Sequence, residues 1–333
     1  MQVIIPTAGR GTRLRPHTHT TAKPLVHVAG KPVLGHILDK LKKVKVDEII
    51  FIIGYLGEQI KDYVKENYDF QTRFVVQEEL KGQAHAIKLA EPYIKEDVLI
   101  WFVDTISDPD IKKLQKTKAD GVIYVKEHED PARFGVVFPD QKGFVENIVE
   151  KPDNPESNLV NIGLYYIKDY KFMFESIDHL IKHDMQTKGE FYIVDAFNLM
   201  INKSSKFKVD TVNIWEDCGK PETLLRTNRY LLDQLKPQKH KNVKGSVIIN
   251  PVNIEKGARI ENSVIGPYVS IAKNSVVKNS IVKDSILNND CQLEKVQLNG
   301  SLIGSYANVK GVSKTLNVGD DSEVIYGKDE DNS

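Results

Sequence analysis

The sequence has few cysteines and no long apolar run. Its 333 residues include two cysteines, Cys218 and Cys291, which lie far apart in the chain. Two distant cysteines exclude a disulfide framework and favour a reducing compartment, so we expect a cytoplasmic protein. No apolar run approaches the roughly 20 residues that a membrane-spanning helix needs. We therefore expect no membrane partner.

The chain also lacks an excess of charge of either sign. It carries 46 basic and 46 acidic residues, which excludes the general positive field of many nucleic-acid-binding proteins. Any anion site must therefore be local. One stretch, PTAGRGTRLRPHTHTTAKP at residues 6–24, holds three arginines and Lys23, and no Asp or Glu precedes Asp39. We call residues 6–24 the basic loop.

Up to about residue 235, short apolar runs alternate with amphipathic segments. We expect helices near residues 33–44, 58–67, 84–93, 170–183, 190–202 and 221–235. We expect strands at residues 3–6, 48–55, 73–77, 98–104 and 207–218, with further strands between 121 and 168. Continuous apolar strands separated by helices predict a mostly parallel α/β sheet covered on both faces. Ligands of such sheets bind at the carboxyl ends of the strands, and the basic loop follows the first strand.

A different pattern begins after residue 235. The segment KPQKHKNVKG at 236–245 has the composition of a linker. Beyond it, aliphatic residues recur every five or six positions from Ile248 to Val309, which predicts a left-handed parallel β-helix; a β-sandwich is the alternative. We therefore divide the chain into an α/β domain at 1–236, a linker at 237–245, a β-helix at 246–326 and a polar tail at 327–333.

The basic loop has the residue types of a phosphate-binding site. Its glycines Gly9 and Gly11 allow backbone N–H groups to approach an anion closely, and its cations add charge-assisted hydrogen bonds. Two familiar phosphate motifs do not fit: the loop has no GxxxxGK[ST], and Leu14 stands where a dinucleotide fingerprint has its third glycine. A merely solvated turn is the alternative reading.

The basic loop and a series of later motifs resemble the sugar-1-phosphate nucleotidyltransferases, the family of glucose-1-phosphate thymidylyltransferase. The loop has the form GxGTRLxPxT followed by KP. The later motifs follow in order: QEELKGQAHAI (77–87), FVDT (102–105), FG (134–135), VEKP (149–152), NIGLY (161–165), KGEFYIVD (188–195) and WEDCGKPETLL (215–225). The resemblance covers residues 1–235 and implies a Rossmann-like mixed sheet, to which several branches of the family add a β-helix.

The resemblance implies a reaction between two phosphates. A sugar 1-phosphate would attack the α-phosphorus of a nucleoside triphosphate, giving an NDP-sugar and pyrophosphate. The nucleophile is already anionic, so catalysis reduces to aligning two polyanions and offsetting their repulsion. The implied catalytic residues are Arg13, Lys23 and Lys151. The implied nucleotide contacts are Ala8, Gly9, Gly11, Thr12, Gln77 and Gly82.

The resemblance also implies a metal ion and a sugar site. Asp104 and Asp217 would hold Mg²⁺, which prefers oxygen ligands, although Val103 replaces the glycine usual before the first aspartate. His17 and His19 are then neighbours of the phosphates rather than metal ligands. The implied sugar-phosphate contacts are Gly135, Glu150, Lys151, Asn161 and Gly163.

The same family resemblance predicts which nucleotide and which sugar the protein uses. A Gln side chain at position 77 offers both a donor and an acceptor to the imide edge of a pyrimidine, which favours dTTP or UTP over GTP. Glucose 1-phosphate is the expected sugar. The alternatives are a mannose-1-phosphate guanylyltransferase and a non-catalytic regulatory subunit that only binds sugar nucleotide; the intact charged residues of the implied site argue against the latter.

The β-helix adds a question of its own, because some hexapeptide-repeat proteins are acyltransferases. Those enzymes commonly use a histidine as base, and the last histidine of this sequence is His240. We therefore expect the β-helix to act in stacking, oligomer formation or regulation rather than in a second reaction. The expected partners are a nucleoside triphosphate, a sugar 1-phosphate and further copies of the chain, without nucleic acid.

Overall fold

The computed structural model describes residues 1–236, 242–311 and 313–325. The chain divides into two compact units: the first comprises Met1–Arg10 and Ile37–Trp215, and the second comprises Gly11–His36 and the chain from Glu216 onward. Most of the basic loop is therefore grouped with the C-terminal part of the chain. The predicted linker is described only from residue 242, and the predicted tail lies outside the described residues. Within the described part of the chain, no helix is long and apolar enough to cross a membrane.

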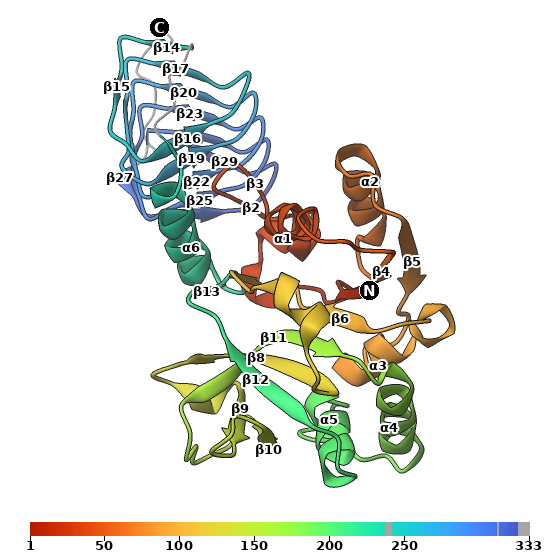
Figure 1. The fold of residues 1–333 in the computed structure, drawn as a ribbon. Coiled ribbons are helices and arrows are strands. Elements are labelled where there is room, and N and C mark those ends of the chain that lie inside the picture. The colour runs from red at the N-terminus through yellow and green to blue at the C-terminus, as the bar shows by residue number, and fades with distance from the viewer. Residues whose placement is uncertain (237–241, 312, 326–333) are drawn as a thin grey trace, which may run out of the picture. The chain divides into compact units, whose positions relative to one another are not determined.

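The first unit is built on a nine-stranded mixed sheet (Figure 1). Its strands are β1 (Gln2–Pro6), β4 (Ile49–Ile53), β5 (Thr72–Val76), β6 (Val98–Trp101), β8 (Gly121–Glu127), β9 (Gly135–Pro139), β10 (Val145–Glu150), β11 (Leu159–Ile167) and β12 (Phe207–Thr211). Along the main path their order is β10-β9-β11-β6-β1-β4-β5, and β8 pairs with β11 and β12. Strands β6, β1, β4 and β5 run parallel, whereas β11 is antiparallel to β6. The predicted Rossmann-like mixed sheet is confirmed.

Helices cover both faces of this sheet. They are α2 (Gly57–Asn67), α3 (Gln83–Lys88), α4 (Tyr170–Lys182) and α5 (Ile193–Asn202). Every residue of β4 is buried, as expected for a parallel strand with helices on both sides. Residues of α3, α4 and α5 share one core cluster with the sheet, and α2 lies on the opposite side from α4 and α5 (Figure 1).

Three predicted elements of the first unit differ from the structure. The helix expected to reach residue 93 ends at Lys88 and is followed by a 3-10 turn at Glu91–Tyr93, because Pro92 cannot continue an α-helix. The strand expected at 98–104 ends at Trp101, so Asp104 lies beyond it. The strand expected at 207–218 is interrupted: β12 ends at Thr211, and β13 covers Trp215–Asp217.

The second unit begins with three 3-10 turns and a hairpin. The turns are Thr12–Leu14, His17–His19 and Lys23–Leu25, and the hairpin pairs β2 (His27–Val28) with β3 (Lys31–Pro32). Helix α1 (Val33–Leu41) starts in this unit and ends in the first, and α6 (Pro221–Asp233) precedes the β-helix.

A buried asparagine on α6 ties these segments to the β-helix. The side-chain oxygen of Asn228 accepts hydrogen bonds from the Ala29 N–H at 3.0 Å and the Ser270 hydroxyl at 2.6 Å. Its amide nitrogen donates to the Tyr268 carbonyl at 3.2 Å. Asn228 is fully buried, so its three hydrogen bonds satisfy polar groups that water does not reach.

The β-helix consists of three stacked parallel sheets. The first contains β14 (Val243–Lys244), β17 (Arg259–Glu261), β20 (Val276–Lys278), β23 (Gln292–Glu294), β26 (Asn308–Lys310) and β29 (Glu323–Ile325). The second contains β15 (Val247–Ile248), β18 (Val264–Ile265), β21 (Ile281–Lys283), β24 (Gln297–Asn299) and β27 (Ser313–Lys314). The third contains β16 (Val252–Ile254), β19 (Val269–Ile271), β22 (Ile286–Leu287), β25 (Leu302–Ile303) and β28 (Asn317–Val318). The predicted left-handed β-helix is confirmed.

Aliphatic and serine residues explain why this sequence forms coils. Ile260, Val277 and Leu293 are buried and stack in register from one coil to the next. The Ser263 hydroxyl donates to a carbonyl of its own coil and accepts the N–H of Ser280 in the next coil at 3.0 Å. The repeat of apolar and small residues in the sequence therefore corresponds to one inward-facing stack and one hydrogen-bonded ladder.

Candidate functional site

The predicted site residues are divided between the two units. The first unit contains Ala8, Gly9, Gln77, Gly82, Asp104, Gly135, Glu150, Lys151, Asn161 and Gly163. The second contains Gly11, Thr12, Arg13, Lys23 and Asp217. Each group has its own geometry within its unit.

In the second unit, Gly11 and Lys23 lie against each other. Gly11 has a left-handed backbone with φ of 63°, and a Cβ there would come 2.8 Å from the Cβ of Lys23. Both the conformation and the close contact require glycine. The Thr18 hydroxyl donates to the Gly11 carbonyl at 2.8 Å and holds the turn together. The loop thus places the aliphatic part of the Lys23 side chain against Gly11, the residue that precedes Thr12.

The same unit brings Arg13 and Asp217 to one glycine. A Cβ at Gly219 would lie 2.9 Å from Asp217 Oδ1 and 3.2 Å from Arg13 Nη2. The Gly219 N–H donates to Asp217 Oδ1 at 2.7 Å, and the Thr227 hydroxyl donates to the Asp217 carbonyl. Two predicted residues that are 204 positions apart in the sequence therefore lie side by side. Gly219 leaves the space that both side chains occupy.

In the first unit, three predicted sugar-site residues form a cluster on neighbouring strands. Gly135 begins β9, Glu150 ends β10, and Asn161 lies on β11. A Cβ at Gly135 would fall 2.0 Å from Asn161 Nδ2 and 2.8 Å from Glu150 Oε2, so a larger residue there would displace these two side chains. Asn161 donates to the Gly135 carbonyl at 3.0 Å and accepts a hydrogen bond from the Tyr165 hydroxyl at 2.5 Å.

Lys151 is held beside this cluster. Its ammonium donates to the Tyr192 hydroxyl at 2.8 Å and lies 3.7 Å from Glu150 Oε1. Burial lowers the pKa of Lys151, but the hydrogen bond to Tyr192 and the nearby carboxylates outweigh it, so the pKa is raised overall. Burial raises the pKa of Glu150, and Lys151 offsets part of that rise. The ammonium is therefore a stable positive charge at this site.

The predicted base-contacting residues lie near the start of α3. Gly82 has φ of 105°, and a Cβ there would meet the backbone N and O of Phe191 at 2.7 Å. The Ala84 N–H donates to the Phe191 carbonyl at 2.9 Å. Gln77 is buried, and its side-chain nitrogen lies 3.2 Å from His85 Nδ1. The close approach of residue 191 is a structural reason for glycine at position 82.

The remaining predicted residues of the first unit are Ala8, Gly9, Asp104 and Gly163. Ala8 and Gly9 follow β1, and Gly163 lies inside β11. Asp104 follows β6 and directly precedes β7 (Thr105–Ser107). The Phe102 N–H donates to the carbonyl of Gly163, which has φ of 72°. Ala8 is buried, whereas Gly9 is exposed. Among the described atoms other than those of Gly9 and its two chain neighbours, none lies within 4 Å of the place where a Cβ at Gly9 would sit.

The carboxylates of the described residues suit a cation that takes its other oxygen ligands from a bound substrate. Residues 1–236, 242–311 and 313–325 contain no group of three or more His, Cys, Asp or Glu placed to hold a metal ion. An all-protein cage is thus not formed by them. Asp217, with Oδ1 held by the Gly219 N–H, supplies a carboxylate of the kind Mg²⁺ uses together with substrate phosphates.

One histidine of the basic loop, His17, has a structural role. His17 is buried, and its Nε2 lies 2.7 Å from Asn317 Oδ1 in the last coil of the β-helix. Burial lowers its pKa, and the contact with Asn317 offsets part of that shift. Packing of a neutral imidazole against the β-helix is a sufficient reason for a histidine at position 17, and no metal ion is needed to explain it.

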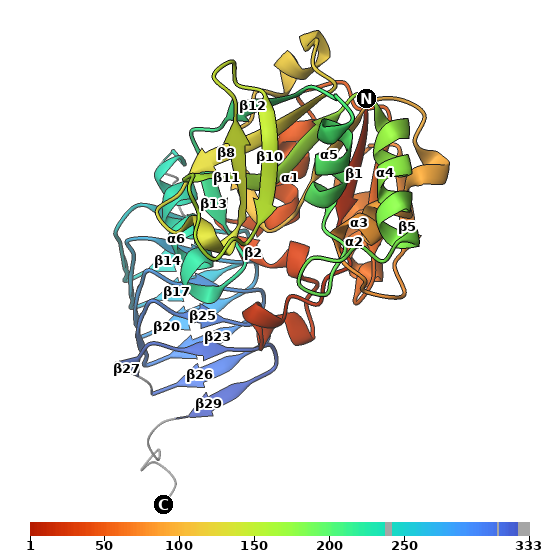
Figure 2. The same cartoon turned by 90° about the horizontal axis from the view of Figure 1, so that it is seen from below.

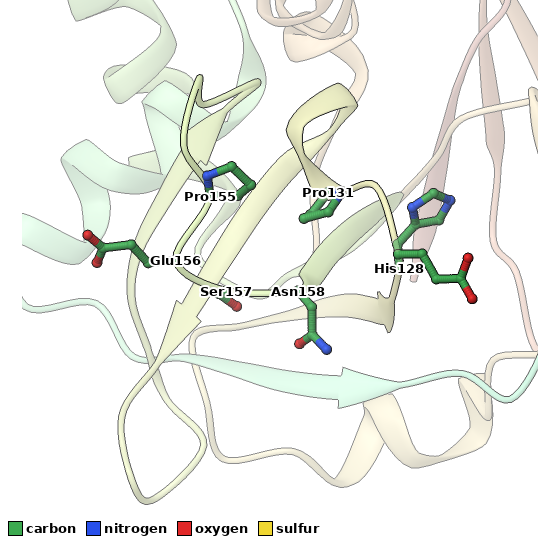
Figure 3. Close-up of a pocket in the computed structure, with 7 residues that line it drawn as sticks. His128, Pro131, Pro155, Glu156, Ser157 and Asn158 are labelled. Carbon is green, nitrogen blue, oxygen red and sulfur yellow. The ribbon is translucent and has the colours of Figure 1, made fainter.

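One open hollow lies outside the predicted site. Figure 3 shows it between the segment after β8 and the segment before β11. Its labelled residues, none of which belongs to the predicted site, are His128, Pro131, Pro155, Glu156, Ser157 and Asn158. The Ser157 hydroxyl already donates to a backbone carbonyl of β9, so it holds its own loop against the sheet.

Sequence reasoning missed two residues that shape the site. Gly219 makes room for Arg13 and Asp217, and Tyr192 accepts the hydrogen bond of Lys151. Both lie inside motifs that carried the resemblance, WEDCGKPETLL and KGEFYIVD. The signal was present in the sequence, but their partners become visible only in three dimensions.

Comparisons with known proteins identify relatives of both parts of the chain. Residues 238–289 match the family described as GlmU-like, C-terminal hexapeptide. The bifunctional protein GlmU of Methanocaldococcus jannaschii is 36% identical over 259 residues, which are 78% of this chain and 61% of that protein. The chain thus spans about 61% of the length of this relative.

A relative and a solved structure extend the likeness. Glucose-1-phosphate thymidylyltransferase of Streptomyces griseus is 27% identical, with 94% of this chain and 90% of that protein covered. A UDP-glucose pyrophosphorylase crystallised with UDP-glucose matches with a TM-score of 0.61 and 21% identity, over 70% of this chain and 99% of that chain, which supports the fold alone. Residues 2–234 match the family described as nucleotidyl transferase, and the chain belongs to that family.

Proposed function

We propose that the chain is a sugar-1-phosphate nucleotidyltransferase, which joins a sugar 1-phosphate to a nucleoside triphosphate and releases pyrophosphate. The observation that carries this proposal is the meeting of Arg13 and Asp217 at Gly219. A guanidinium beside a carboxylate that can hold a cation is what the binding of a polyphosphate requires. In this proposal residues 1–236 form the catalytic part of the chain.

Different residues of the proposed site neutralise the phosphates of the nucleotide and the phosphate of the sugar. Arg13 and Lys23 bind the phosphates of the nucleotide, and the open space at Gly9 allows a phosphate to approach the backbone. Lys151 neutralises the sugar phosphate, and Glu150 accepts hydrogen bonds from sugar hydroxyls. Asp104 and Asp217 would hold Mg²⁺, which offsets phosphate charge when bound.

The protein needs no general base, since the attacking oxygen belongs to a phosphate that is already ionised. Its contribution is to align the sugar phosphate with the α-phosphorus and to keep the two anions together. The Tyr192 hydroxyl and Glu150 hold the Lys151 ammonium in place before substrate binds. Preorganised charge of this kind stabilises the transition state without reorganisation during the reaction.

We further propose dTTP or UTP as the nucleotide and glucose 1-phosphate as the sugar. Gln77 carries both a donor and an acceptor, which suits a pyrimidine imide. The name of the Streptomyces griseus relative supports thymidylyl transfer to glucose 1-phosphate. The Methanocaldococcus jannaschii relative is described as a bifunctional protein, and residues 238–289 of this chain match the GlmU-like hexapeptide family.

We also propose that copies of the chain associate through the β-helix. Val247 and Ile281 are exposed on its second sheet, and Val264 lies between them in register. Three stacked aliphatic residues on one face are a small apolar stripe that association would cover. Sedimentation velocity of the wild type and of a Val247→Lys, Ile281→Lys variant tests this, since the variant should dissociate; an unchanged sedimentation coefficient contradicts it.

The proposed reaction is tested by pyrophosphate release. The purified chain is incubated with Mg²⁺ and each of dTTP, UTP, GTP, ATP and CTP against the 1-phosphates of glucose, mannose and N-acetylglucosamine. We expect release with a pyrimidine nucleotide and glucose 1-phosphate, and none in the presence of EDTA. Turnover only with GTP and mannose 1-phosphate would favour a guanylyltransferase, and product binding without turnover would favour a regulatory subunit.

A further inference from the structure

The basic loop is attached to the last coil of the β-helix. The loop from Gly11 onward belongs to the same compact unit as that coil, and Figure 2 shows this red segment beside β26 and β29. The hydroxyls of Thr20 and Thr21 both donate to the carboxylate of Asp320, the latter at 3.1 Å. His17 reaches the same coil through its contact with Asn317 described above.

The coil fixes Asp320 from its own side. The Ser305 N–H donates to Asp320 Oδ1 at 2.6 Å, while Oδ2 receives the two threonine hydroxyls. The residue before it also packs on the loop, because a Cβ at Gly319 would come 2.9 Å from the Cβ of Pro16. Asp320 thus bridges a turn of the β-helix and the basic loop with both of its oxygens.

The attached part of the loop contacts the proposed phosphate-binding part directly. Thr18 follows the buried His17 and donates from its hydroxyl to the Gly11 carbonyl at 2.8 Å. Lys23 comes two residues after Thr21, and its stem packs against Gly11. Movement of residues 17–21 would therefore displace both Gly11 and Lys23.

We propose that the last coil of the β-helix positions the basic loop for nucleotide binding, with Asp320 and Asn317 as positioning residues. This inference rests on the proposed function and extends it, because it gives the β-helix a part in the reaction besides association. Neither residue touches the nucleotide in this proposal. Each acts through the hydrogen bonds that hold residues 17–21.

The test compares Asp320→Ala with the matched control Glu323→Ala. Glu323 lies in the same coil and accepts a hydrogen bond from Asn308 at 3.1 Å, so its loss weakens the coil without touching the loop. Two quantities are measured on the full chain. The first is the rate of hydrogen exchange of the backbone amides of residues 11–23. The second is KM for the nucleotide and for the sugar 1-phosphate, measured with the two substrates that the wild type turns over. Asn317→Leu is a second variant that removes the partner of His17.

Asp320→Ala removes two charge-assisted hydrogen bonds to the loop, so we expect loop exchange to accelerate at least about tenfold and KM for the nucleotide to rise at least about tenfold. KM for the sugar 1-phosphate should stay within about twofold of the wild type. Asn317→Leu should act in the same direction, and Glu323→Ala should change neither quantity.

Unchanged loop exchange in both variants would overturn the inference. An equal rise of both KM values would also overturn it, because that pattern indicates general destabilisation rather than positioning. A wild type that turns over no substrate pair refutes the proposed function instead, and the exchange measurement then still decides whether the coil holds the loop.

Discussion

Replacing Asp217 by asparagine separates its proposed metal role from its structural role. The carbonyl oxygen of an asparagine can still accept the Gly219 N–H that Asp217 Oδ1 now receives at 2.7 Å. The Thr227 hydroxyl bonds to the backbone carbonyl and is unaffected. We therefore expect the free energy of unfolding of Asp217→Asn to stay within about 0.5 kcal/mol of the wild type.

Activity should fall steeply in the same variant, because the amide removes the negative charge that a cation needs. Loss of a residue that merely supports a metal ligand costs about 10- to 100-fold, so losing a ligand charge should lower kcat/KM by at least about 100-fold. The assay is pyrophosphate release over a Mg²⁺ titration, in which the variant should also need more Mg²⁺.

The matched control is Glu216→Gln. Glu216 is the neighbouring carboxylate on β13 and pairs with Arg226 at 3.2 Å near the surface, so its replacement should cost less than about 1 kcal/mol and leave turnover unchanged. Undiminished turnover in Asp217→Asn, or equal losses in the two variants, would refute the metal assignment.

Three further predictions follow from single contacts. Gly219→Ala should lower kcat/KM by about tenfold in the pyrophosphate assay with little change in urea unfolding, because the added Cβ meets only the movable ends of two site side chains. Asn228→Ala should lower the free energy of urea unfolding by about 3 kcal/mol, since it removes three buried hydrogen bonds of about 1 kcal/mol each; a loss below about 1 kcal/mol would contradict this. Glu150→Gln should become more stable relative to the wild type as pH rises. Burial raises the pKa of Glu150 above its ordinary 4.5, so the wild type loses stability from about pH 4.5 up through the raised value, and unfolding at pH 4 and pH 7 checks this.

Much of the fold could be predicted because apolar periodicity is a local signal. The wholly apolar IIFII of β4 indicates a strand buried on both faces, and the repeat that includes Ile260 and Val277 indicates stacked coils. The predicted helix end at residue 93 was wrong. The pattern of apolar residues continues past Lys88, where α3 ends, and Pro92 interrupts the backbone rather than the pattern.

The attachment of the basic loop to the β-helix could not be predicted from periodicity. The contacts of His17 with Asn317 and of Thr20 with Asp320 join residues 300 positions apart. They are polar, so no repeat of apolar residues in the sequence predicts them. The predicted boundary after residue 236 stays a prediction about the catalytic part of the chain. In the structure, Gly11–His36 instead belong to the same compact unit as the β-helix.

The candidate site could be proposed from the sequence because its residues sit in recognisable motifs. Gly135, Glu150 and Asn161 come from three separate motifs, and the structure brings them into contact within the first unit. Arg13 and Asp217 do the same within the second. Tyr192 escaped sequence reasoning because a buried aromatic residue usually indicates only core packing.

The central claim is that the basic loop and two aspartates bind the phosphates of one nucleotide around a divalent ion. A crystal structure of the chain with Mg²⁺ and the NDP-sugar product tests it most directly. The account predicts Arg13 and Lys23 within hydrogen-bonding distance of phosphate oxygens, with Asp104 and Asp217 on the ion. A nucleotide bound away from these four residues, or an ion held by other side chains, would contradict it.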